Sequence, residues 1–169
     1  MEMNYCMQCG GKLRLREHEG EEHLIPWCDA CSAYRYPVYN TAVSMVVMDE
    51  QKEKVLLIQQ YGRQSWVLVA GYVNQGEDAE DACAREVREE LDMMVRSVRF
   101  NHSHYFKPSN TLMLNFTVTV SEREPRPNEE VDRWSWFSIP EARANIRPGS
   151  LAEAFLKGSF DGTYTFPER

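Results

Sequence analysis

Short runs of hydrophobic residues, separated by polar residues, follow one another along most of the chain. Apolar runs at 42–48 and 55–59 flank a polar segment at 49–54, and this arrangement is typical of a β-hairpin. Further strand-like runs lie at 66–70, 95–100, 111–120 and 134–137. The pattern therefore predicts a β-sheet that begins near residue 41.

The segment 78–91 (DAEDACAREVREEL) has a helical pattern instead. It is rich in strong helix formers, contains neither Gly nor Pro, and opens with acidic residues, all of which favour a helix. On a helical wheel, Cys83, Val87 and Leu91 form one apolar stripe, which we expect to be buried. Two shorter helices are expected near 140–144 and 151–157.

Three glutamates stand at or beside the edge of this apolar stripe. Glu86 and Glu90 border it, and Glu89 lies next to them. Carboxylates three and four residues apart repel one another, and partial burial increases the cost unless a cation neutralises them. Oxygen ligands at this spacing suit Mg²⁺ or Mn²⁺. The alternative interpretation is an acidic helix face that keeps the protein soluble.

The first 40 residues contain four of the five cysteines, in two C-x-x-C pairs. The spacing Cys6-x2-Cys9-x18-Cys28-x2-Cys31 falls within the window of four-thiolate zinc sites. A segment of this size buries too little apolar surface to fold alone, and Zn²⁺ supplies the missing stabilisation. The sequence thus predicts a structural zinc ribbon over 1–40, with a redox dithiol as the competing interpretation.

Composition excludes several classes of protein. With 169 residues, 43% hydrophobic and 27% charged, the chain suits one globular domain with a small appendage, not a disordered or fibrous protein. The net charge of −7 is the wrong sign for general nucleic-acid binding. No apolar run reaches the ~20 residues needed to cross a bilayer. We therefore expect a cytoplasmic protein with no membrane partner.

Residues 71–93 carry a more specific pattern, G-x5-E-x7-R-E-V-R-E-E-L-D-M. It resembles the box of the Nudix hydrolase family, G-x5-E-x7-R-E-U-x-E-E-x-G-U, where U is an aliphatic residue. Asp92 stands where the family has Gly, and Asp tolerates the left-handed conformation that commonly ends a helix. The resemblance implies an α/β fold, an α/β/α sandwich with a mixed sheet, over 41–169. It also implies hydrolysis of a nucleoside diphosphate linked to another moiety.

The same resemblance implies roles for individual residues. Glu86, Glu90 and the carbonyl of Ala70 would be ligands of Mg²⁺ or Mn²⁺, and Glu89 a ligand or the general base. Glu77 and Arg85 would form a supporting ion pair. Glu130, just before the last strand-like run, matches a further metal-binding or catalytic glutamate of relatives, and its alternative interpretation is an ordinary loop acid. Which glutamate takes the proton stays open.

A zinc ribbon directly before a Nudix domain resembles the NADH pyrophosphatase branch of the family. Tyr36 and Tyr72 match aromatic positions that contact adenine there, and Ala152 matches an alanine near the base. The branch's diagnostic stretch S-Q-P-W-P-F-P-x-S-L-M is altered at 104–109, where Tyr105 and Phe106 offer an aromatic pair for a substrate ring. Packing of this pair in the core is the alternative.

The resulting functional prediction is a Mg²⁺- or Mn²⁺-dependent hydrolase that cleaves NAD(H) to AMP and NMN(H). ADP-ribose or an ADP-sugar is the alternative substrate. A catalytically inactive nucleotide sensor joined to a zinc-ribbon adaptor is the alternative from another class, and the intact set of glutamates disfavours it. By resemblance to relatives with a ribbon, we expect a homodimer.

Overall fold

The computed structural model describes residues 3–121 and 124–167. Contacts divide the chain into two compact units, Met1–Tyr39 and Asn40–Arg169, which we describe separately. The smaller unit is a three-stranded antiparallel sheet in the order β1-β2-β3. Its strands are β1 (Arg14–Arg16), β2 (Ile25–Cys28) and β3 (Ala33–Tyr34).

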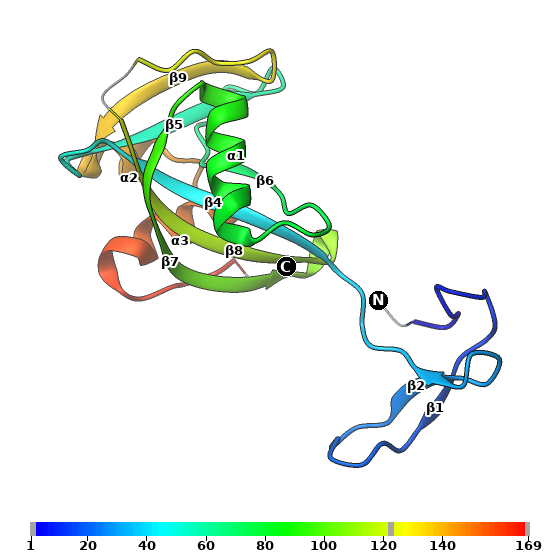
Figure 1. Ribbon diagram of the computed structural model, residues 1–169. Coiled ribbons are helices and arrows are strands. Elements are labelled where there is room, and N and C mark those ends of the chain that lie inside the picture. The colour runs from blue at the N-terminus through cyan, green and yellow to red at the C-terminus, as the bar shows by residue number, and fades with distance from the viewer. Residues whose placement is uncertain (1–2, 122–123, 168–169) are drawn as a thin grey trace. The chain divides into compact units, whose positions relative to one another are not determined.

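The larger unit is a six-stranded mixed sheet between helices (Figure 1). Strand β4 lies at its centre and pairs in parallel with β8, while the other pairs are antiparallel. Strands β7, β8, β4, β5 and β9 follow one another in space, and β6 pairs with β4. Their bounds are β4 Asn40–Met48, β5 Lys54–Gln60, β6 Val69–Tyr72, β7 Val95–Phe106, β8 Thr111–Val120 and β9 Val131–Ser138.

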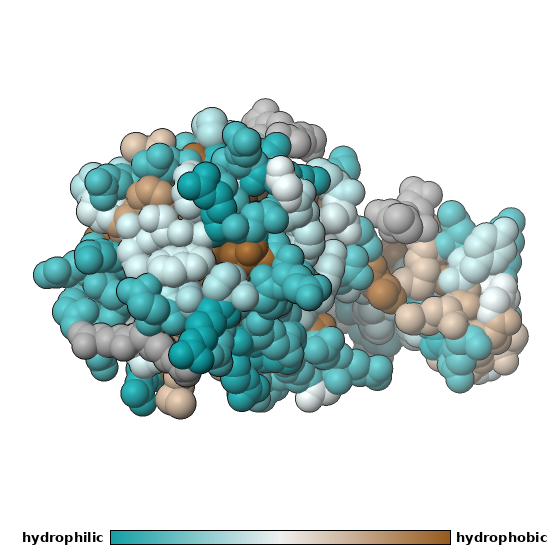
Figure 2. Space-filling view, turned by 90° about the horizontal axis from the view of Figure 1, so that it is seen from above, coloured by the Kyte–Doolittle hydropathy of each residue, from teal (hydrophilic) through white to brown (hydrophobic). Residues whose placement is uncertain are grey.

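Alternate residues of the central strand face opposite layers of the core. Val43, Met45 and Val47 of β4 pack with helix α1 (Ala79–Leu91). Val46 and Met48 pack instead with α2 (Ile139–Asn145) and α3 (Leu151–Asp161). Helices thus cover both faces of the sheet, which confirms the predicted α/β/α sandwich. Apolar residues gather inside, and the face of the larger unit in Figure 2 is mostly hydrophilic.

Helix α1 begins and ends as its sequence predicts. Asp78 is the N-terminal cap residue, and Cys83, Val87 and Leu91 are buried. Asp92 ends the helix in the left-handed conformation (φ 52°, ψ 35°), and its backbone N–H donates to the carbonyl of Arg88. Asp therefore takes the conformation in which glycine is more usual.

Two strands differ from the prediction. The expected strand at 66–70 is displaced toward the C-terminus, since Trp66 and Val67 form only isolated bridges and β6 spans Val69–Tyr72. Strand β7 continues beyond residue 100 to Phe106, because it pairs with β8 along its length despite two irregularities of register. The sequence did not predict this extension, because the alternation of apolar residues stops at Phe100 and mostly polar residues follow it. Among the described residues, no helix is long and apolar enough for a transmembrane span.

Candidate active site

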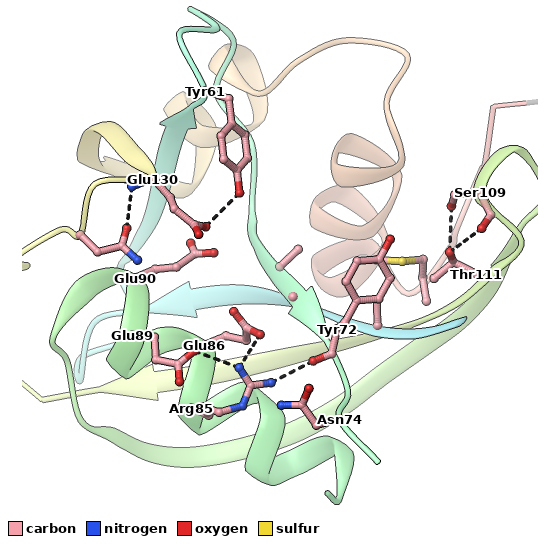
Figure 3. A pocket seen from close by; sticks show the side chains of 15 residues that line it. Tyr61, Tyr72, Asn74, Arg85, Glu86, Glu89, Glu90, Ser109, Thr111 and Glu130 are labelled. Carbon is pink, nitrogen blue, oxygen red and sulfur yellow. Dashed lines mark hydrogen bonds and ion pairs between the residues drawn. The ribbon is translucent and has the colours of Figure 1, made fainter. Parts of the chain in front are cut away.

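A cavity of about 500 Å³ opens in the larger unit where α1, β6 and the segment before β9 meet. Four carboxylates line it: Glu86, Glu89 and Glu90 from α1, and Glu130 from the residue just before β9 (Figure 3). Ala70 of β6 lines the same cavity. The fold thus brings to one place the residues that the sequence predicted as ligands of a divalent metal.

Glu86 reaches this cavity because residue 71 has no side chain. A Cβ atom built on Gly71 would overlap the carboxyl group of Glu86. Gly71 lies in β6, paired with Val43 of the central strand, so the backbone there has little room to retreat. Glycine at this position is therefore required by the close approach of helix and strand.

Glu90 is the most deeply buried carboxylate of the cavity. Its residue is only 3% exposed, and its Oε2 accepts a hydrogen bond from Gln60 Nε2 at 3.1 Å. Burial, together with the charges of Glu86 and Glu130, raises the pKa of Glu90 to about 8. Without a neighbouring cation this group therefore holds a proton at neutral pH.

Glu130 is held from two sides. Tyr61 donates its hydroxyl hydrogen to Glu130 Oε2 at 2.9 Å, and the Glu130 backbone N–H donates to Asn128 Oδ1 at 2.9 Å. The hydrogen bond with Glu130 raises the pKa of Tyr61. Tyr61 and Asn128 line the cavity too, although neither was predicted as a site residue.

Arg85 is the cation closest to these acids, and its guanidinium is shared among several of them. It forms ion pairs with Glu77 (2.7 Å), Glu86 (2.7 Å) and Glu89 (3.0 Å), and it also donates to the carbonyl of Tyr72 at 2.8 Å. The bond from Arg85 lowers the pKa of Glu77 to about 2. The ion pair of Glu77 with Arg85 agrees with the resemblance, and it anchors the segment before α1 to the helix.

The donor set fits a hard divalent cation. Four carboxylates around one cavity, one of them almost fully buried, create a concentration of negative charge that Arg85 neutralises only in part. Partial protonation or a bound cation would relieve the remainder. At present their oxygens are bonded to Arg85, Gln60 and Tyr61. Glu86, Glu89, Glu90 and Glu130 are the residues that could hold Mg²⁺ or Mn²⁺, once their oxygens exchange these partners for the ion.

The predicted substrate contacts lie in different places. Tyr72 lines the carboxylate cavity and is 58% exposed, which leaves its ring available to a ligand. Ala152 of α3 lines a second, adjoining cavity. Tyr105 and Phe106 line neither, and Tyr105 instead donates its hydroxyl to Asn110 Oδ1 at 2.7 Å. Tyr36 is exposed and belongs to the smaller unit, so it is not among the residues that line this cavity.

Several residues of the site were not predicted from the sequence. Gln60 and Tyr61 follow a predicted strand, and Ser109 and Thr111 flank the start of another. Their only local signal was a polar or aromatic residue at the end of a strand. Because loops far apart in the chain meet at this cavity, such residues are recognised only in the folded structure.

The four N-terminal cysteines form a separate cluster. All four sulfur atoms lie within 4.8 Å of one another, with Cys6 to Cys31 at 3.9 Å and Cys9 to Cys28 at 3.5 Å. Tetrahedral Zn²⁺ with Zn–S bonds of about 2.3 Å separates its sulfurs by about 3.8 Å. The cluster therefore fits the predicted zinc ribbon.

Arg35 supports the cysteine cluster from outside. Its Nε donates to Cys6 Sγ at 3.2 Å. Burial acts to raise the pKa of the Cys6 thiol, but this hydrogen bond and those from the backbone outweigh it and lower the pKa to about 6. The thiolate is the form of cysteine that binds metal, so Arg35 favours the ligating form.

Comparison with known proteins places this geometry in a family. Residues 38–155 match the family model described as the NUDIX domain. The chain is 26% identical over 159 residues to the NAD-capped RNA hydrolase NudC of Vibrio parahaemolyticus, covering 92% of this chain and 58% of that relative. The chain therefore spans little more than half the length of this curated relative.

Solved structures show the same fold. A NUDIX hydrolase from Nitrosomonas europaea aligns with a TM-score of 0.64 at 23% identity, covering 97% of this chain and 96% of the other. The NUDIX domain of Shewanella oneidensis NrtR, solved in complex with ADP ribose, aligns with a TM-score of 0.59 at 15% identity, covering 75% and 88%. With its family model matched over residues 38–155 and the same fold in these structures, the chain belongs to the NUDIX family.

Proposed function

We propose that this chain is a hydrolase that requires a divalent metal and cleaves the diphosphate of a nucleoside diphosphate linked to another moiety, with NAD(H) to AMP and NMN(H) as its reaction. The cavity with four carboxylates carries this proposal. Sequence similarity to an NAD-capped RNA hydrolase supports NAD-related substrates, although the chain spans only 58% of that relative.

Each side chain has a role in this proposal. Glu86, Glu90, Glu130 and the carbonyl of Ala70 hold the metal, and Glu89 is a further ligand or the general base. When bound, Mg²⁺ or Mn²⁺ supplies charge that neutralises the diphosphate and acidifies an attacking water. Glu77 and Arg85 keep the segment before α1 in position, and Tyr61 orients Glu130. Tyr72 provides an exposed ring at the cavity that can stack on a ring of the substrate.

Residues outside this cavity complete the proposal. Tyr36 would contact the nucleobase from the smaller unit, and Tyr105 with Phe106 would contact a substrate ring only after a change from the present arrangement, since neither lines the cavity. A structural Zn²⁺ held by the four clustered cysteines would stabilise residues 1–40, and residues 41–169 would form the hydrolase domain. Two copies would associate as a homodimer, which light scattering of the purified chain can check.

ADP-ribose is the second candidate substrate. An ADP ribose complex of a NUDIX domain with the same fold favours it as a ligand class. A nucleotide sensor without turnover is the candidate from another class. The complete set of carboxylates at the cavity argues against the sensor, because binding alone does not require several carboxylates to be held close together.

The test is incubation of the full chain with NADH, NAD⁺ and ADP-ribose in Mg²⁺ or Mn²⁺, with products separated by chromatography. We expect AMP with NMN or NMNH. Cleavage of ADP-ribose alone would replace the NAD assignment, and no turnover of any of the three would favour the sensor.

The variant Glu90→Gln should lower turnover by about 100-fold or more, since the metal loses a charged ligand while the helix keeps its packing. Glu80→Gln is the matched control, because Glu80 lies on the same helix, is exposed and does not line the cavity. Equal activity of the two variants would remove the role assigned to Glu90.

A further inference from the structure

A second cavity of about 290 Å³ adjoins the carboxylate cavity. The two share Tyr61, Ala70 and Met113 in their walls. A ligand whose diphosphate lay among the carboxylates could therefore reach this second cavity with one of its halves.

The floor and rim of the second cavity differ in chemistry. Its floor is apolar, with Leu68, Met113 and Phe155 among its residues. Two arginines, Arg63 and Arg147, stand at its rim and are exposed. Such a site suits a ligand with a flat ring that packs on the apolar floor and an anionic group that binds the arginines.

The two arginines are free to bind an anion. Within residues 3–121 and 124–167, neither guanidinium forms an ion pair or hydrogen bond. Arg85, the cation of the carboxylate cavity, is by contrast shared among three glutamates. In a chain of net charge −7, these two arginines supply positive charge beside an acidic cavity.

Both arginines come from loops that the backbone holds in place. The Arg147 N–H donates to the carbonyl of Trp66 at 2.9 Å, which ties its loop to the segment after Arg63. Ser150 Oγ also donates to the Arg147 carbonyl at 2.6 Å. The turn before Arg63 is fixed by a hydrogen bond of 2.6 Å, which the Gly62 N–H donates to Asp132 Oδ2. Arg63 and Arg147 are thus fixed at their backbones across one cavity.

The geometry points to a phosphate-recognition subsite, in which Arg63 and Arg147 bind an additional phosphate on the ribose of the substrate's adenosine half. This inference rests on the proposed function. All its candidate substrates share an adenosine half, and the apolar floor receives the purine of that half. Arginine forks bind phosphate oxygens in pairs, which makes them selective for such a group. A 2′-phosphorylated dinucleotide and an RNA chain that continues from the 3′ oxygen both carry this chemistry.

Binding to the full chain tests the subsite without any need for turnover. Calorimetry would compare AMP with adenosine 2′,5′-bisphosphate and adenosine 3′,5′-bisphosphate. We expect one bisphosphate to bind about 10-fold more tightly than AMP, as charge-assisted hydrogen bonds of this kind provide. Preference for the 2′ isomer indicates a phosphorylated dinucleotide, and preference for the 3′ isomer indicates an RNA chain.

The variants Arg63→Gln and Arg147→Gln should each remove most of that preference and leave AMP binding nearly unchanged. Arg96→Gln is the control, since Arg96 is equally exposed and lies at neither cavity. Equal binding of all three nucleotides would overturn the subsite. A uniform loss of binding in both variants would overturn it too, because the arginines would then hold a phosphate common to the three.

Hydrolysis assays separate this inference from the proposed function. If the chain prefers a bisphosphate but cleaves no dinucleotide, the subsite stands and the hydrolase proposal fails. If it cleaves NAD⁺ while binding AMP and both bisphosphates equally, the hydrolase stands and the subsite fails.

Discussion

At the scale of single residues, the candidate active site depends on very close packing between one glycine and one carboxylate. Gly71 leaves room for the Glu86 carboxyl group, and Arg85 then pairs with that group at 2.7 Å. A single added methyl group would therefore disturb the carboxylates of the cavity while leaving the core of the sheet intact.

We expect Gly71→Ala to lower turnover by about 100-fold, because the Glu86 side chain must leave its position. Steady-state kinetics of the single variants Gly71→Ala and Glu86→Ala and of the double variant would check this. If Gly71 acts through Glu86, adding Gly71→Ala to Glu86→Ala should lower turnover little further. If the two losses of turnover were fully additive, Gly71 would act by a mechanism that does not involve Glu86.

The raised pKa of Glu90 predicts that the stability of the metal-free protein depends on pH. In the metal-free protein its pKa is about 8, against an ordinary value of 4.5, so the folded state binds the proton more tightly than the unfolded chain. Its contribution to stability is therefore most favourable below about pH 4.5 and decreases as the pH rises toward 8. Metal-free Glu90→Gln should gain stability over the native chain at pH 8 but not at pH 4, as thermal unfolding would show.

A divalent metal binds the ionised carboxylate, so its binding at pH 7 should release about one proton. Calorimetry of Mn²⁺ binding in buffers of different ionisation enthalpy measures this number. Release of no proton would mean that Glu90 is already ionised or does not bind the metal.

At the scale of elements, the C-terminal segment packs against α3 and β7. Tyr164 stacks on His102 with ring centroids 4.2 Å apart, and Phe166 stacks on His104 at 3.8 Å. A Cβ atom on Gly158 of α3 would overlap the Tyr164 ring. Helix α3, which carries Ala152, is thereby connected to the edge strand through aromatic contacts.

Gly158→Ala should therefore destabilise the protein by about 1–3 kcal/mol, although alanine is the better helix former. In a Tyr164→Ala background the overlap is absent, and the same substitution should be neutral or stabilising. Urea unfolding of the two single variants and the double variant gives the coupling between them. Equal destabilisation in both backgrounds would contradict the contact.

At the scale of the whole molecule, the two units have separate sources of stability. The larger has apolar layers on both faces of its sheet, while the smaller has a short sheet and a cluster of four cysteines. Among residues 3–39 of the smaller unit, the buried hydrophobic residues are Cys6 and Cys28. Metal binding would therefore provide most of its folding free energy.

We expect Cys6→Ser to abolish zinc binding and to unfold the smaller unit, while amides of the larger unit keep their protection from hydrogen exchange. Zinc content by elemental analysis and hydrogen exchange by mass spectrometry would measure these effects. Cys83→Ala is the control, because Cys83 lies on the buried face of α1 in the core of the larger unit, and its loss should leave zinc content unchanged. Retention of zinc by Cys6→Ser would contradict the four-thiolate site.

Much of this organisation follows from local pattern. The apolar stripe of Cys83, Val87 and Leu91 predicted the helix and its buried face, because a helical period of 3.6 residues determines which side chains share a face. The same period placed three glutamates together. Asp92 was predicted to end the helix and does so, since its left-handed conformation is a local preference.

The remainder required tertiary structure. The polar extension of β7 to Phe106 is stabilised by pairing with β8, which no local pattern of β7 reveals. Tyr61 meets Glu130 only because β5 and β9, which are distant in sequence, lie side by side. Tyr105 lies on this extension of β7, where its hydroxyl donates to Asn110 and its ring does not line the cavity.

The sequence by itself determined the helix that carries the glutamates, the cysteine spacing and the family resemblance, because each depends on residues close together in the chain. The tertiary structure alone decided that Gly71 makes room for Glu86, that Glu90 is buried, and that two arginines face a cavity beside the acids. These properties depend on distances between separate segments. Only folding brings such segments together, and with them the desolvation and close packing that change their chemistry.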